Sequence, residues 1–179
     1  TKEIIEAQKP MIIFGQSFLK SKSAEFLFSS FKKFLLSNNK FTEDWNPLNV
    51  ISSDAATVGS LDLDIINQKS DLIKNLSEHK FDLVFLMGQD NIKFNKKNEF
   101  VVYIGSHGDN GAELADIILP GAAYTEQSGH YTNLEGKIQK AHKASYPPGD
   151  AKEDWQIINE LAKFMNNRGL FNDKDELES

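Results

Sequence analysis

The segment from Val102 to Gln139, "VYIGSHGDNGAELADIILPGAAYTEQSGHYTNLEGKIQ", joins two apolar runs to six glycines and a series of polar side chains. The apolar runs, residues 100–104 and 117–119, have the length of buried strands. The remainder has little helical or strand regularity, and this predicts a tightly specified backbone. Such a segment serves either as a catalytic site or as a structural connection.

Over the rest of the chain, short apolar runs alternate with segments in which apolar residues recur with the period of an α-helix. The expected strands are residues 10–14, 48–51, 81–87, 100–104 and 117–119. The expected helices are residues 23–36, 64–76, 111–115 and 154–165. Near-continuous apolar strands that mostly end in glycine and alternate with helices are typical of a parallel sheet covered on both faces. We therefore expect an α/β fold with a three-layer, Rossmann-like parallel sheet flanked by helices, followed by an extended C-terminal segment.

Two helices have a clear apolar pattern. Helix 23–36 is expected to have Leu27, Phe31, Phe34 and Leu35 on one face and to begin at a capping Ser21 or Ser23. On helix 154–165 the expected buried stripe consists of Trp155, Ile158, Leu161, Ala162 and Met165. Residues 89–98 form a polar insertion that interrupts the alternation of strands and helices. We predict a single domain over residues 1–171 and a frayed acidic tail over residues 172–179.

Composition restricts the classes of function. The 26 acidic and 20 basic residues give a formal charge of −6, which disfavours a nucleic-acid partner. The absence of cysteine excludes disulfides, thiolate zinc sites and cysteine-held iron–sulphur clusters from this chain. The longest apolar runs are far shorter than the ~20 residues of a transmembrane helix, so no direct membrane span is expected. The first ten residues show no targeting signal.

Glycines and histidines are the first candidates for a functional site. Gly15, Gly88 and Gly105 follow strands, as phosphate-binding glycines do, but no spaced glycine fingerprint or P-loop follows them. Tight turns are therefore the favoured explanation. The four histidines lack the helical spacing of a metal site. These histidines are His79, His107, His130 and His142.

Hydroxyl and carboxylate groups are the second candidates. Ser106, His107 and Asp109 have the residue types of a catalytic triad, but neighbours in one turn do not provide the geometry of nucleophile, base and orienting acid. Hydrogen bonding within the loop is the simpler explanation. Four carboxylates could include a general acid–base pair, although caps, loop contacts or interface contacts are favoured. They are Glu113, Asp116, Glu126 and Glu135.

The order of motifs in the opening segment resembles the closing part of the molybdopterin oxidoreductase family. Within it, the chain is similar to the large iron–sulphur (75 kDa) subunits of mitochondrial complex I, the NADH:ubiquinone oxidoreductase. The patterns G-x-H-G-D-x-G-A, A-D-x-I/V-L-P-G-A-A-Y-T-E and Y-x-N-x-E-G-R-x-Q fall on residues 105–112, 115–126 and 131–139. The matching motif residues are Gly105, His107, Gly108, Asp109, Gly111, Asp116, Pro120, Gly121, Tyr124, Glu126, Gly129, Asn133, Glu135, Gly136 and Gln139.

The resemblance covers nearly the whole chain. It continues through "KPMIIFGQS", "DWNPLNV", "DLVFLMGQD" and "PPGDAKEDWQII". It implies a non-catalytic scaffold part of the large subunit in the peripheral (matrix) arm of complex I, supporting electron transfer from NADH to ubiquinone. It also implies no cofactor in this chain, iron–sulphur clusters in the N-terminal part of the same subunit, and other peripheral-arm subunits as partners. The implied location is the mitochondrion, on the matrix side of the inner membrane.

Two positions depart from the family pattern. His130 replaces the threonine that usually follows the glycine at 129, and Lys137 replaces the arginine of N-x-E-G-R. Lysine lacks the planar fork of arginine, so an anion site built on that arginine would be weakened. This departure favours a chain without a pterin.

The resemblance leaves alternatives open. The catalytic relatives share the segment 115–139, so an active molybdopterin-binding domain of a formate-dehydrogenase-like enzyme is the second hypothesis, with Asn133, Glu135 and Lys137 near the pterin. A free-standing nucleotide-binding protein is a third. The missing N-terminal region of the family has three explanations: a split gene, a processed chain, or a part of a longer chain. Frequent residues with AT-rich codons favour a split, organelle-encoded subunit.

The hypothesis of a structural connection makes a prediction about the backbone. We expect residues 105–139 to be mostly buried, with polar side chains that bond to loop backbone groups. Gly121 and Gly129 are the expected positions of positive φ. Gly129→Val should then cost about 1–3 kcal/mol.

Overall fold

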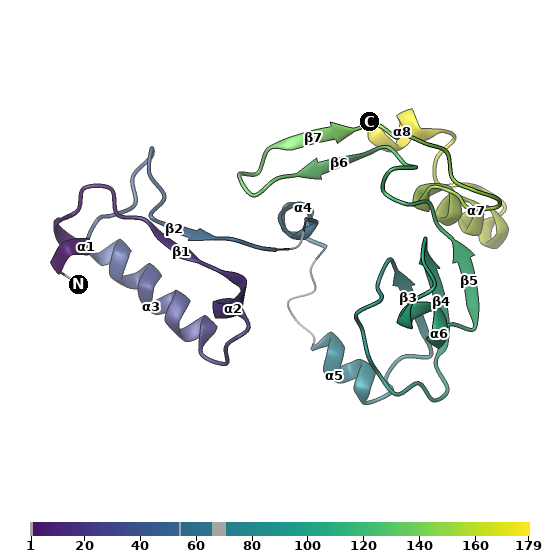
Figure 1. The fold of residues 1–179 in the computed structure, drawn as a ribbon, viewed down its shortest axis with the longest axis horizontal. Coiled ribbons are helices and arrows are strands. Elements are labelled where there is room, and N and C mark those ends of the chain that lie inside the picture. The colour runs from purple at the N-terminus through teal and green to yellow at the C-terminus, as the bar shows by residue number, and fades with distance from the viewer. Residues whose placement is uncertain (1, 54, 66–70) are drawn as a thin grey trace. The chain divides into compact units, whose positions relative to one another are not determined.

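The computed structural model describes residues 2–53, 55–65 and 71–179 (Figure 1). Its helices are α1 Lys2–Glu6, α2 Gln16–Leu19, α3 Ala24–Ser37, α4 Thr57–Asp62, α5 Leu72–Ser77, α6 Asn110–Leu114, α7 Asp154–Asn166 and α8 Lys174–Glu178. Its strands are β1 Ile12–Phe14, β2 Leu48–Val50, β3 Leu83–Met87, β4 Phe100–Gly105, β5 Ile117–Pro120, β6 Gly129–Thr132 and β7 Ile138–Ala141. The predicted α/β class, with parallel strands flanked by helices, is confirmed.

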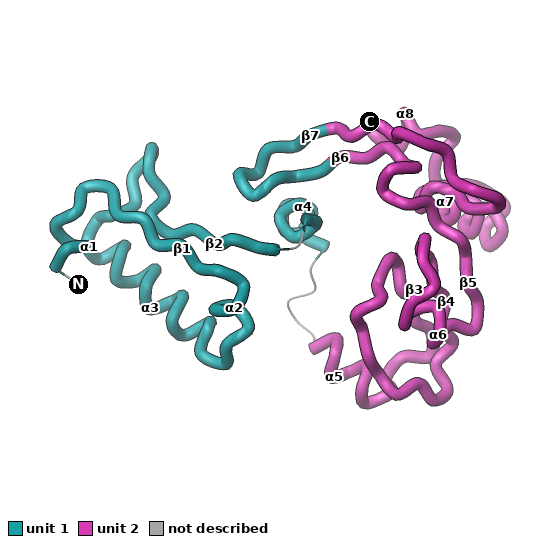
Figure 2. The backbone as a smooth tube through the Cα atoms, viewed as in Figure 1, with its two compact units in different colours: residues 1–65, 131–139 teal, residues 66–130, 140–179 magenta. Residues whose placement is uncertain are grey.

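The strands form three small sheets in place of one continuous sheet. β1 pairs with β2 in parallel, β3, β4 and β5 form a parallel sheet in that order, and β6 pairs with β7. The chain divides into two compact units, residues 1–65 with 131–139 and residues 66–130 with 140–179 (Figure 2). The boundary of the units passes through the β6–β7 hairpin. A single domain over 1–171 stays a prediction, because compactness does not report which parts unfold together.

Phenylalanines build the core of the first unit. Phe14, Leu35 and Leu48 are its buried centre. The ring of Phe14 stacks on Phe18 with centroids 4.1 Å apart and meets the edge of Phe31 at 5.6 Å. These aromatic pairs connect β1 to the helices that follow it and stabilise the β1–α3–β2 crossover.

Helix α3 closely follows the predicted helix 23–36. Leu35, Phe31 and Phe34 of the predicted face pack into the core, whereas Leu27 is 36% exposed. Ser23 occupies the N-cap position, but its side chain makes no capping hydrogen bond. The backbone N–H of Ala24 instead donates to the carbonyl oxygen of Ser21, so a turn starts this helix.

In the second unit, one face of the β3–β4–β5 sheet is covered. Leu86, Val101 and Tyr103 point to this face and are 4%, 0% and 1% exposed. Ile92 and Phe94 of the polar insertion 89–98 pack against them. Ala112 of α6 and Ala115, which follows this helix, also contact the buried set. The insertion thus takes the place of a covering helix between β3 and β4.

The other face of this sheet carries large apolar side chains in contact with solvent. Side chains alternate along a strand, so these residues lie opposite the covered set. We call this side the open face. Its exposed members, with exposed fractions of 44–52%, are Leu83, Phe85, Met87, Phe100 and Ile117, and Val102, Ile104 and Leu119 share this face. On the central strand, Val102 and Ile104 are 7% and 3% exposed, so solvent reaches this face along β3 and at the first residues of β4 and β5.

The predicted helix 64–76 is only partly correct. Asp64 follows the end of α4 and has a φ of 52°, a left-handed conformation that terminates a helix. A second helix, α5, begins at Leu72 after the capping Asp71, whose side chain accepts a hydrogen bond from the backbone N–H of Lys74. The part of the prediction on residues 66–70 lies outside the described residues.

Helix α7 forms where predicted, and Trp155 and Ala162 of its apolar stripe are half-buried, but the other residues of the stripe are exposed. Ile157 and Asn159 are the buried residues, whereas Ile158, Leu161 and Met165 are 38%, 36% and 71% exposed. The side-chain oxygen of Asn159 accepts hydrogen bonds from the backbone N–H groups of residues 170 and 171, and its amide donates to the carbonyl of 171. These hydrogen bonds of Asn159 set which side of α7 faces inward, and a pattern of apolar residues does not predict them.

The expected frayed tail is also wrong. Residues 174–178 form α8, and the side chain of Asp173 accepts a hydrogen bond from the backbone N–H of Glu176 at 2.9 Å. The Lys140 ammonium lies 2.6 Å from the Glu178 carboxylate. The acidic residues thus have specific partners that tie the terminus down.

Candidate functional site

The motif segment begins around a buried tyrosine. The Tyr103 hydroxyl lies 3.1 Å from Oδ2 of Asp90 and 3.0 Å from the carbonyl oxygen of His107. Burial raises the pKa of Tyr103 to about 12, and the hydrogen bond to Asp90 acts in the same direction. The phenol is therefore a neutral hydrogen-bond donor at physiological pH.

Two motif glycines pack directly on this tyrosine. A Cβ atom on Gly105 would collide with the Tyr103 hydroxyl. A Cβ atom on Gly111 would lie 2.6 Å from Cε2 of Tyr103 and 2.8 Å from the carbonyl oxygen of Gln89. Gly108, between them, has open space around it. We call Tyr103, Asp90, Gly105 and Gly111 the tyrosine site; its glycines are required for close packing.

Positive φ occurs at glycines other than the two expected. Gly88, Gly136 and Gly149 have φ values of 59°, 78° and 56°, whereas Gly121 and Gly129 do not adopt this region. Gly121 is instead a position of close approach, with its Cβ position 3.2 Å from Oδ1 of Asp154. Gly129 starts the extended strand β6. The expected strain energy of Gly129→Val therefore loses its basis.

Two motif carboxylates bond to backbone N–H groups, one in strand β4 and one in the loop that follows β5. The Asp116 carboxylate accepts hydrogen bonds from the backbone N–H of Val101 at 2.8 Å and from Lys96 at 2.7 Å. The Lys96 partner lowers the pKa of Asp116. Glu126 accepts a hydrogen bond from the backbone N–H of Ala123 at 2.9 Å. These contacts hold turns and do not bring two carboxylates together.

The triad-like residues are only partly assembled. Oγ of Ser106 lies 2.9 Å from Nδ1 of His107, and both side chains are exposed to solvent. Asp109 is the N-cap residue of α6, and in the described chain it makes no hydrogen bond to His107. An exposed pair of this kind lacks the orienting acid and the water exclusion that acyl-transfer chemistry uses.

The histidines and carboxylates do not gather into a metal site. Residues 2–53, 55–65 and 71–179 contain no group of three or more potential ligands. His79 pairs with the buried Glu99 at 2.6 Å. Hydrogen bonds from the backbone N–H groups of Lys97 and Glu99, and then from His79, lower the pKa of Glu99 to about 2. This pair connects the end of α5 to the start of β4.

The proposed pterin ligands are placed by the hairpin turn. Oδ1 of Asn133 accepts hydrogen bonds from the backbone N–H groups of Glu135 and Lys137, both at 2.9 Å. Asn133 and Gln139 line a hollow of about 370 Å³ in the first unit, with Ser52 and Tyr131 among the other lining residues. Glu135 and Lys137 are exposed on the turn and do not line it. The geometry does not fit a pterin held by all three side chains.

A buried carboxylate organises the far end of the motif region. Glu153 is 7% exposed and accepts hydrogen bonds from Lys174 at 2.7 Å, Trp155 at 3.2 Å and Lys143 at 3.4 Å. It also forms a capping box with Gln156 at the start of α7. Burial raises the pKa of Glu153, but the hydrogen bonds and charges of its partners outweigh burial and lower it. We call this set the glutamate site.

The glutamate site ties three segments together. Lys174 donates to the carbonyl oxygen of Ser128 at 2.6 Å as well as to Glu153. The neighbouring Asp154 is half-buried, and burial raises its pKa. Glu153 with Gln156 three residues later has the form of a capping box, so the sequence held a signal for the cap. No local pattern indicated the two lysines, which lie 10 and 21 residues away.

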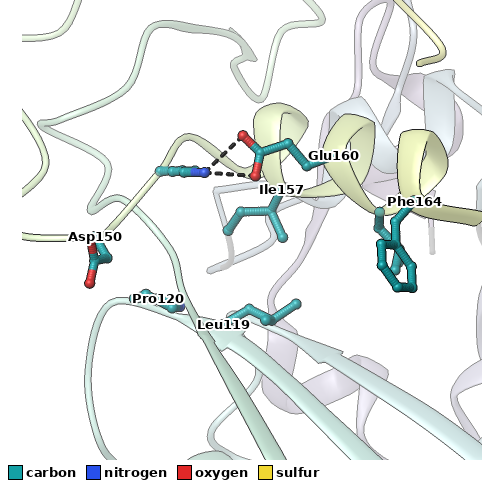
Figure 3. Close-up of a pocket in the computed structure, with 8 residues that line it drawn as sticks. Leu119, Pro120, Asp150, Ile157, Glu160 and Phe164 are labelled. Carbon is teal, nitrogen blue, oxygen red and sulfur yellow. Dashed lines mark hydrogen bonds and ion pairs between the residues drawn. The ribbon is translucent and has the colours of Figure 1, made fainter. Parts of the chain in front are cut away.

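A cavity of about 520 Å³ lies between α7 and the end of β5 (Figure 3). Ile157 and Phe164 of the helix and Leu119 and Pro120 of the strand line it. The Lys152 ammonium, paired with the Glu160 carboxylate at 2.6 Å, is its main polar feature. The lining is mostly apolar, and the Lys152 ammonium and the Glu160 carboxylate are already paired with each other. These features are more typical of a packing defect than of a catalytic site.

The remaining motif side chains are open to solvent. Tyr124 is 77% exposed, and Glu113 also faces solvent. The expectation that residues 105–139 are mostly buried is wrong, because only Gly111, Gly121 and Ala122 are buried in this range. The glycines and side-chain bonds specify the backbone without enclosing it.

In the described chain, no helix is both long and apolar enough to cross a bilayer.

Comparison with known proteins identifies the family. The sequence profile described as molybdopterin oxidoreductase matches residues 1–164. The chain is 39% identical over 170 residues to the NADH-ubiquinone oxidoreductase 75 kDa subunit of Reclinomonas americana, covering 93% of this chain and 24% of the relative. It is 40% identical over 171 residues to the mitochondrial 78 kDa subunit of Candida albicans, covering 94% and 23%.

A bacterial relative has the same extent of similarity. This relative, a subunit of the NADH-quinone oxidoreductase of Rickettsia typhi, is 42% identical over 167 residues, which cover 92% of this chain and 24% of the relative. The chain thus spans about a quarter of the length of the relatives it matches. The resemblance to this family and to the large subunit of the NADH-ubiquinone oxidoreductase is confirmed, while the placement in its closing part stays a prediction.

Proposed function

Because the chain belongs to the molybdopterin oxidoreductase family, we propose that it is a non-catalytic structural part of the large iron–sulphur subunit of respiratory complex I. One observation carries this proposal: identities of 39–42% over more than nine-tenths of the chain to subunits of this enzyme from mitochondria and bacteria. In that role the chain supports electron transfer from NADH to ubiquinone without carrying electrons.

The site geometry supports a structural role. The tyrosine site uses its polar groups to hold the loop 105–111, and the glutamate site uses them to hold the C-terminal segment. Asp116 and Glu126 bond to backbone N–H groups. An active site would instead direct several such groups toward one open volume.

The proposal includes partners and location. The chain holds no cofactor, and iron–sulphur clusters lie in the N-terminal part of the same subunit. Its partners are that part and other subunits of the peripheral arm, on the matrix side of the inner membrane of the mitochondrion.

Quantitative mass spectrometry of native complex I, purified from the source organism, tests the proposal. The molar amount of peptides from this chain should equal that of the flavin-bearing subunit through every purification step. Their reproducible presence in another assembly, together with absence from complex I, would refute it.

One rival retains support from family membership and from the hollow near Asn133: an active molybdopterin-binding domain of a formate-dehydrogenase-like enzyme. This function requires molybdenum or tungsten and a releasable pterin in stoichiometric amount on the native assembly. Elemental analysis with pterin fluorescence on the purified assembly distinguishes the two. We expect both signals to be below one-tenth of the flavin content.

A further inference from the structure

The open face is an apolar surface on a sheet type that is normally covered on both sides. Five of its side chains are between 44% and 52% exposed, Val102 and Ile104 on the central strand are 7% and 3% exposed, and none of these side chains carries a charge. Parallel strands in α/β proteins are near-continuously apolar because helices cover both faces. On β3 and β4 the covered face of the same sheet follows this rule, with Leu86, Val101 and Tyr103 almost fully buried, while Ile118 on the β5 edge is exposed. The open face therefore has the composition of an interior surface.

Its dimensions suit one helix. Three neighbouring strands with spacings of about 4.8 Å span roughly 10 Å, close to the diameter of an α-helix with its side chains. The apolar surface continues along β5 from Ile117 to Leu119, which points to the same face and lines the cavity beneath α7. Leu161 and Phe164 of α7 also line this cavity. A helix beside α7 would thus contact both the sheet and the exposed side of α7.

We propose that the open face binds an apolar α-helix from the remaining part of the large iron–sulphur subunit. This inference rests on the proposed function. The relatives are about four times as long as their match to this chain, so the large subunit holds ample polypeptide to supply the helix. The absence of charge on the face predicts recognition by aliphatic and aromatic side chains, with little dependence on salt.

Adjacent residues of β5 provide a matched pair of variants. Ile117 lies on the open face and is 45% exposed, while Ile118 points to the opposite face and is 53% exposed. Tagged Ile117→Lys and Ile118→Lys chains would be expressed beside the untagged wild type. Incorporation is the ratio of tagged to untagged peptide in purified complex I. We expect at least a tenfold reduction for Ile117→Lys and less than a twofold change for Ile118→Lys. Phe85→Lys, at the centre of the β3 edge, should match Ile117→Lys.

Thermal unfolding of the purified chains separates misfolding from lost docking, since all three variants should melt within a few degrees of the wild type. Incorporation of Ile117→Lys and Phe85→Lys at the wild-type level would overturn the inference while leaving the proposed function intact. Absence of the wild-type chain from complex I would overturn both.

Oxidative footprinting of Met87 tests the same surface without mutation. Its thioether should react in the free chain at a rate within about threefold of an unfolded peptide, and at least fivefold more slowly in complex I. Protection of Met87 in the free monomer would show that the chain covers its own sheet, and protection that accompanies dimerisation would identify a second copy as the occupant. Either result contradicts the proposed helix.

Discussion

The tyrosine site and the glutamate site hold the two ends of the motif region by opposite means. At the tyrosine site a neutral ring fills the space left by Gly105 and Gly111, so shape holds the loop. At the glutamate site a buried carboxylate collects two ammonium groups and an indole N–H, so charge holds the segment. Steric packing of this kind tolerates no added atom, whereas an ionic cluster tolerates change in shape but not loss of charge.

The largest expected effect is steric. Gly111→Val should reduce the free energy of unfolding by about 3 kcal/mol, because the added atoms meet the Tyr103 ring and a backbone carbonyl that cannot yield easily. Gly108→Val, three residues earlier in open space, should stay within about 0.5 kcal/mol of the wild type. Urea unfolding of both variants measures the difference. Equal costs at the two positions would contradict the packing role of Gly111.

The next effect is electrostatic. Glu153→Gln should cost about 1–2 kcal/mol, because Lys143 and Lys174 lose a partly buried partner. Glu160→Gln is the matched control, since it breaks an ion pair with Lys152 whose side chains are 45% and 58% exposed. The control should cost less than about 0.5 kcal/mol. Urea unfolding at low salt again reports both values, and a larger loss for Glu160→Gln would refute the ranking.

The pH dependence should separate the two sites at opposite ends of the scale. The pKa of Glu153 is lowered from 4.5, so its contribution is present above pH 4.5 and is lost as the pH falls below that value. The pKa of Tyr103 is raised from 10.0 to about 12, so its contribution is present below pH 10 and is lost as the pH rises toward 12.

Unfolding free energies from pH 3 to pH 11 test this separation. Glu153→Gln should flatten the acid side only, and Tyr103→Phe should flatten the alkaline side only. Glu99, with a pKa of about 2, contributes a further acid loss that both variants keep. Loss of the alkaline slope in Glu153→Gln would show that the two sites are not separate.

The smallest effects are expected at motif side chains outside both sites. His107→Ala removes an exposed contact with Ser106, and Glu126→Gln keeps an acceptor for the backbone N–H of Ala123. Neither change should alter NADH oxidation by complex I when the rate is normalised to flavin. A tenfold loss with normal assembly, equal to about 1.4 kcal/mol in the activation barrier, would locate chemistry in this loop.

The sequence predicted features that depend on neighbouring residues. Apolar runs that end in Gly88 and Gly105 located β3 and β4, and amphipathic spacing located α3 and α7. It did not predict that Ile92 and Phe94 cover a sheet, because two apolar residues in a polar insertion form no pattern. The inward face of α7 depends on hydrogen bonds from Asn159 to residues 170 and 171, which periodicity does not encode.

The sites differ in the same way. The glycine spacing of residues 105–111 indicated a specified backbone, although the tyrosine behind it was not identified. The glutamate site joins residues up to 46 positions apart, counting the contact of Lys174 with Ser128, and only its capping box of Glu153 with Gln156 has a local sequence signal. The positive φ values expected at Gly121 and Gly129 were wrong, because a close approach can require glycine at Gly121 without a positive φ and Gly129 begins an extended strand.

A cryo-EM map of native complex I tests the central claim most directly. We expect density for this chain in the peripheral arm, next to the cluster-bearing part of the large subunit. We also expect a helix from that subunit over Phe85 and Ile117. No pterin density is expected beside Asn133. A complete peripheral arm without this chain, or a molybdenum pterin bound to it, would contradict the account.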